Sequence, residues 1–174
     1  MPTWTERLAV ELGWPRPRGS MNWGDVESAL GTSLPASYKS HSEMFGWGEF
    51  GNFIEVFSAS LEPESGSIVG ECRRRQDWAD VDDEFASMYA PFELFPSPSG
   101  LLIWGAMERG GSLFWETSGE DPNKWPIVAV TEDDRKFSYQ MEVSEFIFKC
   151  ISGGVGPFFV RGEVRSFTPI YSYE

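Results

Sequence analysis

The apolar residues of this 174-residue chain change their spacing part-way along it, and no other feature of the sequence constrains the fold as strongly. Before Asn52 they recur every three or four residues, as on one face of a helix. From Asn52 onward there are short runs rich in β-branched and aromatic residues, such as Phe53-Ile-Glu-Val-Phe57, which are typical of strands. Helices that precede a mostly antiparallel sheet and pack against it form an α+β fold.

Three short helices are predicted before this change. They cover residues 5–12, 22–31 and 34–46. Each ends at a glycine, the residue that most easily takes the left-handed conformation at a helix C-terminus. Asn22 is a good N-cap for the second helix, and Pro35 suits the first turn of the third.

The sequence after Asn52 predicts two further helices and a meander of strands. One amphipathic helix is expected between Cys72 and Tyr89, with an apolar face of Trp78, Val81, Phe85 and Met88. Strands are expected at Leu101–Met107, Ser112–Thr117, Ile127–Thr131 and Phe137–Met141, and a last one at Glu163–Phe167. Val143–Ser152 is the clearest amphipathic helix, because its apolar residues fall at i, i+3, i+4, i+7 and i+8.

The length of the chain fits a single domain, residues 1–174. No secretion signal and no apolar run long enough to span a membrane is visible, so we expect a cytoplasmic protein. Cys72 and Cys150 are far apart in sequence and are interpreted as buried thiols in a reducing compartment, with a disulfide as the alternative.

The chain is acidic, with 14 Lys and Arg against 27 Asp and Glu and a net charge of −13. Such a charge repels nucleic-acid phosphates and anionic membranes and favours a basic protein partner. Acidic residues gather between 77 and 84, in a predicted helix, and between 132 and 134, in a predicted turn. They are either solvated surface or a docking surface. The candidate partner-binding residues are Asp77, Asp80, Asp83, Glu84, Glu132, Asp133 and Asp134.

Two motifs resemble ligand sites but lack the required context. Gly46-Trp-Gly48-Glu-Phe-Gly51 spells the dinucleotide pattern G-x-G-x-x-G, yet a helix precedes it and a strand follows, the reverse of the order that places phosphate at a helix N-terminus. A helix-to-strand turn is the better interpretation. Asp121, Asn123 and Glu132 have calcium-loop spacing, but Pro126 occupies the position that needs glycine.

His41 is the single histidine, and no nucleophile motif or zinc-ligand spacing accompanies it. We expect it on the surface or on a helix face. The sequence therefore predicts no catalytic residue, no cofactor and no metal site.

Two stretches together resemble the SUKH superfamily. Leu34-Pro35-Ala-Ser-Tyr38-Lys39 and Phe45-Gly46-Trp-Gly48-Glu-Phe50 are similar to its "LP-x-x-Y-K … (Y/F)-G-x-G-x-F" signature. The second stretch, similar to the C-terminal half of many bacterial members, comprises Phe95–Gly105, Gly110–Trp115, Pro122–Val128 and the helix Val143–Ser152. The resemblance covers residues 20–155, between an N-terminal helix with its linker (1–19) and a C-terminal tail (156–174). It departs at Ala36 and Ser37, where members often carry an acid, and at His41-Ser42, where the helix is usually more apolar.

The matched residues also have a role in folding. We expect Leu34 and Tyr38 to be buried against the sheet, and Gly46 and Gly48 to permit positive φ. Trp104, Phe114 and Trp115 should pack across adjacent strands. With Pro35 these residues specify the fold, so that partner choice must lie in exposed residues elsewhere.

The resemblance implies a non-catalytic module, which bacteria use mainly as the immunity partner of polymorphic toxin systems, frequently nucleases. Toxin neutralisation by direct binding to a basic toxin domain is therefore the leading hypothesis. The alternative is an intracellular regulatory or scaffold module without a toxin partner, as in related fungal regulators of cell-wall synthesis. A hydrolase that uses His41 or paired carboxylates is a third hypothesis.

Overall fold

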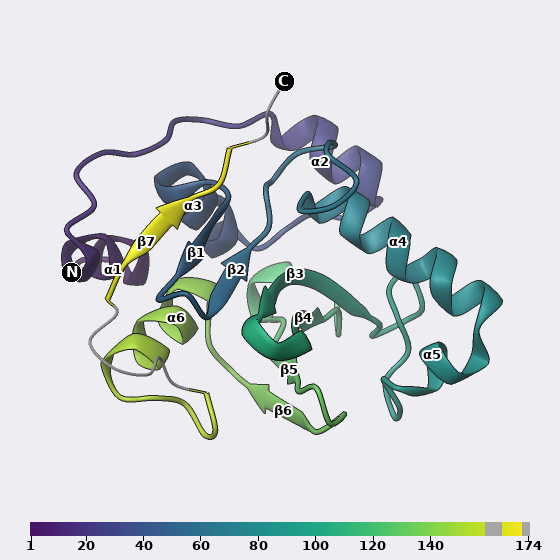
Figure 1. Cartoon of the computed structure of the whole chain (residues 1–174). Coiled ribbons are helices and arrows are strands. Elements are labelled where there is room, and N and C mark those ends of the chain that lie inside the picture. The colour runs from purple at the N-terminus through teal and green to yellow at the C-terminus, as the bar shows by residue number, and fades with distance from the viewer. Residues whose placement is uncertain (159–164, 172–174) are drawn as a thin grey trace.

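A seven-stranded antiparallel sheet runs through the computed structural model, which describes residues 1–158 and 165–171 (Figure 1). Its strands are β1 (Gly48–Phe50), β2 (Ile54–Val56), β3 (Leu101–Met107), β4 (Gly111–Glu116), β5 (Ile127–Val130), β6 (Lys136–Tyr139) and β7 (Phe167–Pro169). The spatial order is β6-β5-β4-β3-β2-β1-β7, a meander to which β7 returns beside β1. The α+β prediction is confirmed.

Six α-helices and two 3₁₀-helices accompany the sheet in the described part of the chain. They are α1 (Trp4–Leu12), α2 (Trp23–Leu30), α3 (Ala36–Phe45), α4 (Ile68–Val81), α5 (Asp83–Ser87), α6 (Val143–Ser152), η1 (Glu108–Gly110) and η2 (Pro122–Lys124). Gly13 and Gly31 end α1 and α2 in the left-handed conformation, as predicted. Helix α6 has the predicted bounds because its apolar face is continuous over ten residues.

Helices α3 and α6 pack on one face of the sheet, and α1 packs against both helices. Phe45 of α3 packs edge-on against Phe50 of β1, with ring centroids 5.2 Å apart. Tyr38 packs edge-on against Trp115 of β4 at 5.0 Å, and its hydroxyl donates a hydrogen bond to the Phe57 carbonyl. Aromatic contacts therefore run along the sheet on this face, and Tyr38 is buried against the sheet as expected.

The opposite face is covered only over its centre. Successive strand residues point to opposite faces, so Phe114 points away from its neighbour Trp115 and packs edge-on against Tyr89, which follows α5 (5.4 Å). Helix α4 packs on β3. Central strands β3 and β5 are consequently buried on both faces, whereas β1 and β2 alternate between buried and half-buried residues.

The single helix predicted between Cys72 and Tyr89 is wrong. Helix α4 begins earlier, at Ile68, and the Asp82 carboxylate then accepts hydrogen bonds from the Glu84 and Phe85 amides (3.0 and 3.1 Å). This cap starts a separate helix, α5. The expected apolar face is not buried as a unit, since Trp78 is 44% and Val81 84% exposed.

Strand β1 lies inside the glycine motif that was interpreted only as a turn. Gly46 has positive φ as expected, but the reason given for Gly48 is wrong, because Gly48 is a strand residue that pairs with Val56 and Pro169. A Cβ on Gly48 would lie 2.1 Å from Cε2 of Phe167. The absence of a side chain therefore lets β7 approach β1. Of the predicted last strand Glu163–Phe167, residues 163–164 lie outside the described residues.

A buried ion pair fixes the start of α4. Glu71 is 3% exposed, and its carboxylate accepts hydrogen bonds from Arg74 (2.7 Å), Arg75 (2.6 Å) and the Gly66 amide (2.9 Å). Charge-assisted bonds of this kind offset the cost of burying the carboxylate. Helix α4 is therefore held at its N-terminal half, while its C-terminal half faces solvent.

Candidate functional site

The predicted partner-binding residues fall on two surfaces, and every one of them is exposed. Asp77 and Asp80 lie in the last two turns of α4, and Asp83 and Glu84 begin α5. These four residues form what we call the α4–α5 acidic face, and Figure 1 shows both helices along one side of the molecule. Glu132, Asp133 and Asp134 lie in the turn between β5 and β6. Among the described residues no hydrogen bond or ion pair joins the two surfaces.

The acids of the β5–β6 turn have a local structural role. The Thr131 hydroxyl donates a hydrogen bond to Asp133 (2.5 Å), and Arg135 forms an ion pair with the same carboxylate at 3.0 Å. These hydrogen bonds lower the pKa of Asp133, that from Thr131 contributing most. Part of the negative charge of this turn is therefore already compensated by the chain itself.

The acids of the α4–α5 acidic face differ in how their charge suits the dipole of the helix that carries them. Asp83 and Glu84 lie in the first turn of α5, where the helix dipole favours negative charge. Asp77 and Asp80 approach the negative end of α4, whose last turn carries no basic residue. Carboxylates near this end of a helix oppose the dipole, most strongly at Asp80 in the last turn, while Asp77 has Arg73 four residues before it.

The basic residues nearest to this face lie before it on α4, where exposed Arg73 is four residues before Asp77 and Arg74 lies over the Trp78 ring. Six acids and no Lys or Arg occur between Gln76 and Met107. Arg74 and Arg75, one turn earlier on α4, are engaged by Glu71. Beside the acids lie the exposed side chains of Trp78 and Val81, which supply apolar surface. Apolar anchors within a charged rim are typical of protein interfaces.

A groove of about 710 Å³ adjoins the acidic face. One wall is built from α4 and α5, and the other from residues 92–97. The Gln76 amide donates a hydrogen bond to the Phe95 carbonyl (2.8 Å) and so ties the two walls together. Asp80 and Asp83 belong both to the groove and to the acidic face.

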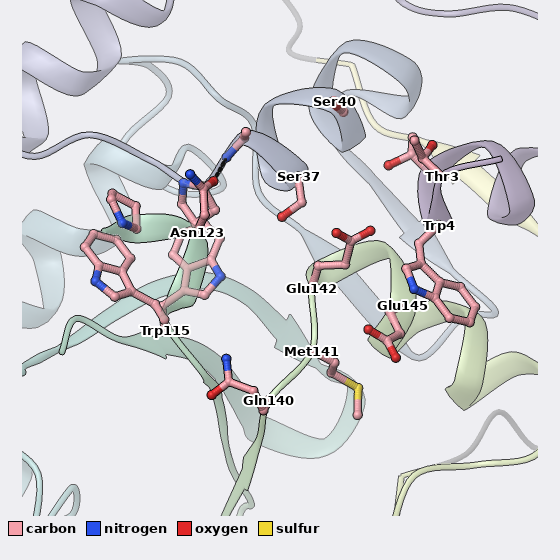
Figure 2. A pocket seen from close by; sticks show the side chains of 15 residues that line it. Thr3, Trp4, Ser37, Ser40, Trp115, Asn123, Gln140, Met141, Glu142 and Glu145 are labelled. Carbon is pink, nitrogen blue, oxygen red and sulfur yellow. Dashed lines mark hydrogen bonds between the residues drawn. The ribbon is translucent and has the colours of Figure 1, made fainter. Parts of the chain in front are cut away.

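A second pocket, of about 490 Å³, lies where the N-terminal ends of α1, α3 and α6 meet η2 (Figure 2). Its lining includes Thr3, Trp4, Ser37, Asn123, Glu142 and Glu145. The Asn123 side chain accepts a hydrogen bond from the Ala36 amide (2.8 Å) and thereby caps α3 from a distant segment. In Figure 2 the Glu142 side chain points toward Ser37.

The two carboxylates of this pocket differ in charge compensation. Glu145 forms an ion pair with Lys149 (2.6 Å), and Lys149 also lies near the Trp4 ring. Burial, and then repulsion from Glu145, raises the pKa of Glu142. Glu142 makes no ion pair or side-chain hydrogen bond with the described residues. The pocket can therefore accept a donor group, but its lining does not define one chemical class of ligand.

Behind the wall of this pocket lies a buried polar chain that joins three helices. Thr5 of α1 is bonded to Ser144 of α6 (2.9 Å), and Ser144 to Nδ1 of His41 on α3 (2.8 Å). His41 is on a helix face as one of our expectations stated, but it is fully buried and not on the surface. Burial lowers its pKa to about 3, so the imidazole is neutral. His41 and Ser144 are both 0% exposed, so this serine–histidine pair is not presented at the surface.

Other candidate ligand residues do not converge in the described ranges 1–158 and 165–171. The Asp121 carboxylate caps η2 by accepting a hydrogen bond from the Asn123 amide (3.0 Å). This structural role accounts for Asp121 and Asn123, two of the residues with calcium-loop spacing. No group of three or more His, Cys, Asp or Glu residues there could hold a metal ion. Within the same residues no helix combines the length and apolarity needed to cross a membrane. Cys72 and Cys150 are buried and are not joined to each other.

Sequence reasoning missed the two pockets because their linings come from segments far apart in the chain. The groove brings the 92–97 segment to α4, and the second pocket combines five segments of the chain. One local signal was available for the groove: acids, aromatic residues and small residues alternate without any Lys or Arg from Gln76 to Met107. Comparison of the chain with known protein families, with curated proteins and with solved structures gives no match.

Proposed function

We propose that this chain is an immunity protein that binds a cognate basic toxin domain and neutralises it by direct, non-catalytic association. The observation that carries the proposal is the α4–α5 acidic face, where Asp77 and Asp80 are exposed and oppose the dipole of α4. Residues that work against their own helix are better explained by a partner than by the fold. The resemblance to the SUKH superfamily supplies the class of partner, and remains a prediction.

The charge of this face suits such a partner. A nuclease binds phosphates through lysines and arginines, and a surface without basic residues would attract those side chains. Steering of this kind accelerates association and weakens as salt screens the charges. The protein would act in the cytoplasm of the cell that makes it, where it meets the toxin.

Co-expression with the toxin-like open reading frame next to its gene tests the proposal. We expect the cells to survive and the two proteins to purify together. The double variant Asp77→Asn/Asp80→Asn should slow association measurably, whereas Glu62→Gln/Glu120→Gln should not. That control removes the same charge at exposed positions outside the acidic face. Survival without a complex would contradict direct inhibition.

A further inference from the structure

The groove between α4–α5 and residues 92–97 is lined by apolar and polar residues in equal number, and three of the polar residues are acids. Phe92, Leu94 and Phe95 are partly exposed along one wall. Ala79 and Ala86 on the helical wall are small, and this leaves the groove open. Its volume of about 710 Å³ falls within the range of about 300–1,000 Å³ typical of ligand pockets.

The only titratable residues that line the groove are acids. They are Asp80, Asp83 and Glu93, which are exposed and come from α4, α5 and the 92–97 segment respectively. None of the three makes an ion pair within the described part of the chain. Carboxylates on both sides of a groove with one aromatic wall complement a side chain that combines a long apolar stem with a delocalised positive charge.

We propose that this groove is an anchor site for an arginine side chain of the partner protein. The guanidinium would lie among the carboxylates of Asp80, Asp83 and Glu93, and the methylene stem would lie against the aromatic wall. Arginine fits better than lysine, because its planar guanidinium is more weakly hydrated, bonds carboxylates in pairs and stacks on aromatic rings. The inference rests on the proposed function for the identity of the partner, but the site itself can be tested without one.

If the groove is an anchor site, the acids that line it should affect binding differently from the other acids on the same helices. Asp80 and Asp83 would contact the bound guanidinium, whereas Asp77 and Glu84 belong to the acidic face but do not line the groove. Close charge pairs chiefly control dissociation, and peripheral charges chiefly control association. Neutralisation of Asp80 or Asp83 should therefore accelerate dissociation of a bound complex, and neutralisation of Asp77 should mainly slow its formation.

An NMR titration of the full chain with Nα-acetyl-arginine methylamide tests the site directly. Nα-acetyl-citrulline methylamide is the matched control, since it has nearly the same shape and no charge. We expect saturable shifts of the Ala79, Ala86 and Leu94 amides with the arginine probe, and at least tenfold weaker binding of the citrulline probe. Equal responses to the two probes, or arginine shifts confined to the Glu132–Asp134 turn, would overturn the proposal.

Two substitutions check that the shifts report the groove. Ala86→Trp fills it without a change of charge and should abolish saturation, whereas Val81→Trp places the same bulk at an 84% exposed site outside it and should leave binding intact. Glu93→Gln, in the loop, should weaken binding severalfold even if Ala86→Trp fails to fold. Unchanged affinity in Glu93→Gln and in a folded Ala86→Trp would refute the anchor site.

The titration and the co-expression experiment fail independently. A groove that binds the arginine probe in a protein that protects against no toxin would leave the anchor site standing and reject the immunity role. If the protein protects cells against the toxin but its groove does not bind the arginine probe, the immunity role would stand and the anchor site would be rejected.

Discussion

Helices α6 and α4 are both predicted as amphipathic from apolar spacing, yet they bury their apolar residues to very different extents. Val143, Phe146 and Ile147 of α6 are all completely buried against the sheet and its neighbouring helices. At the C-terminal end of α4, Trp78 and Val81 remain exposed among carboxylates. Apolar residues with the same helical spacing are therefore packed in the core in α6 and exposed on the surface at the end of α4.

Acidic residues distinguish the two helices. Helix α6 has a single glutamate in its first turn, Glu145, whose charge suits the dipole and is also paired with Lys149. Helix α4 instead carries Asp77 and Asp80 toward its C-terminal end, and its last turn has no basic residue. Periodicity shows where a helix forms, and the placement of charge relative to the dipole indicates whether its face belongs to the core or is free for a partner.

The largest expected effect is the difference in stability lost when an apolar side chain is truncated on α6 and on α4. Phe146→Ala removes a completely buried ring and should lower the free energy of unfolding by about 3–5 kcal/mol. Val81→Ala should change it by less than about 0.5 kcal/mol, because Val81 is already exposed. Urea unfolding of the two variants measures both values. A loss of several kcal/mol in Val81→Ala would show that the α4 face is part of the core.

A smaller effect concerns the buried polar chain on the α6 side. Because burial lowers the pKa of His41 to about 3 in the folded state, from an ordinary 6.5, the unfolded chain binds an extra proton between these values. Stability contributed by the neutral imidazole is complete above about pH 6.5 and is lost as the pH falls, by about 1.4 kcal/mol per unit.

Urea unfolding should therefore show a loss of about 2 kcal/mol between about pH 7 and pH 5. In His41→Asn, which cannot titrate but can still bond Ser144, the loss should shrink to the part contributed by carboxylates. An equal pH dependence in wild type and variant would mean that His41 is solvated in the folded protein.

The smallest effect tests the acids of α4. Asp77→Asn/Asp80→Asn should raise the free energy of unfolding at low salt by about 0.3–1 kcal/mol, since two charges that oppose the helix dipole are removed. Asp82→Ala should instead lower it by about 0.5–2 kcal/mol, through loss of the α5 cap. Urea unfolding of the two variants measures both changes in the free energy of unfolding. A double variant less stable than wild type would assign these acids a structural role and weaken the case for a partner.

Elements with a continuous local pattern could be predicted from the sequence, and those that depend on distant partners could not. Helix α6 and strand β3 lie where spacing places them. Strand β1 has three residues and exists through pairing with β2 and β7, which no local pattern reports, and the last strand predicted from the sequence reached only Phe167 of β7. Burial of His41 likewise depends on Ser144, 103 residues away.

The candidate site was predictable in part. The sequence identified the acids of the α4–α5 face, because charge is visible without a structure. It could not show the cap at Asp82, which begins α5 directly after α4, nor the hydrogen bond from Gln76 to Phe95 that ties the two walls of the groove together. Both depend on the path of the backbone after the helix.

The close approach of Phe167 to Gly48 bears on self-association. Strand β7 occupies the edge of β1, whose backbone groups would otherwise be available to a strand of a second molecule. The edge that β7 itself presents is three residues long and ends in Pro169, which has no amide hydrogen to donate. A Cβ at position 48 would clash with Phe167 and with the Thr168 carbonyl, so we expect Gly48→Ala to displace β7 and to expose the backbone groups of β1 that β7 now covers.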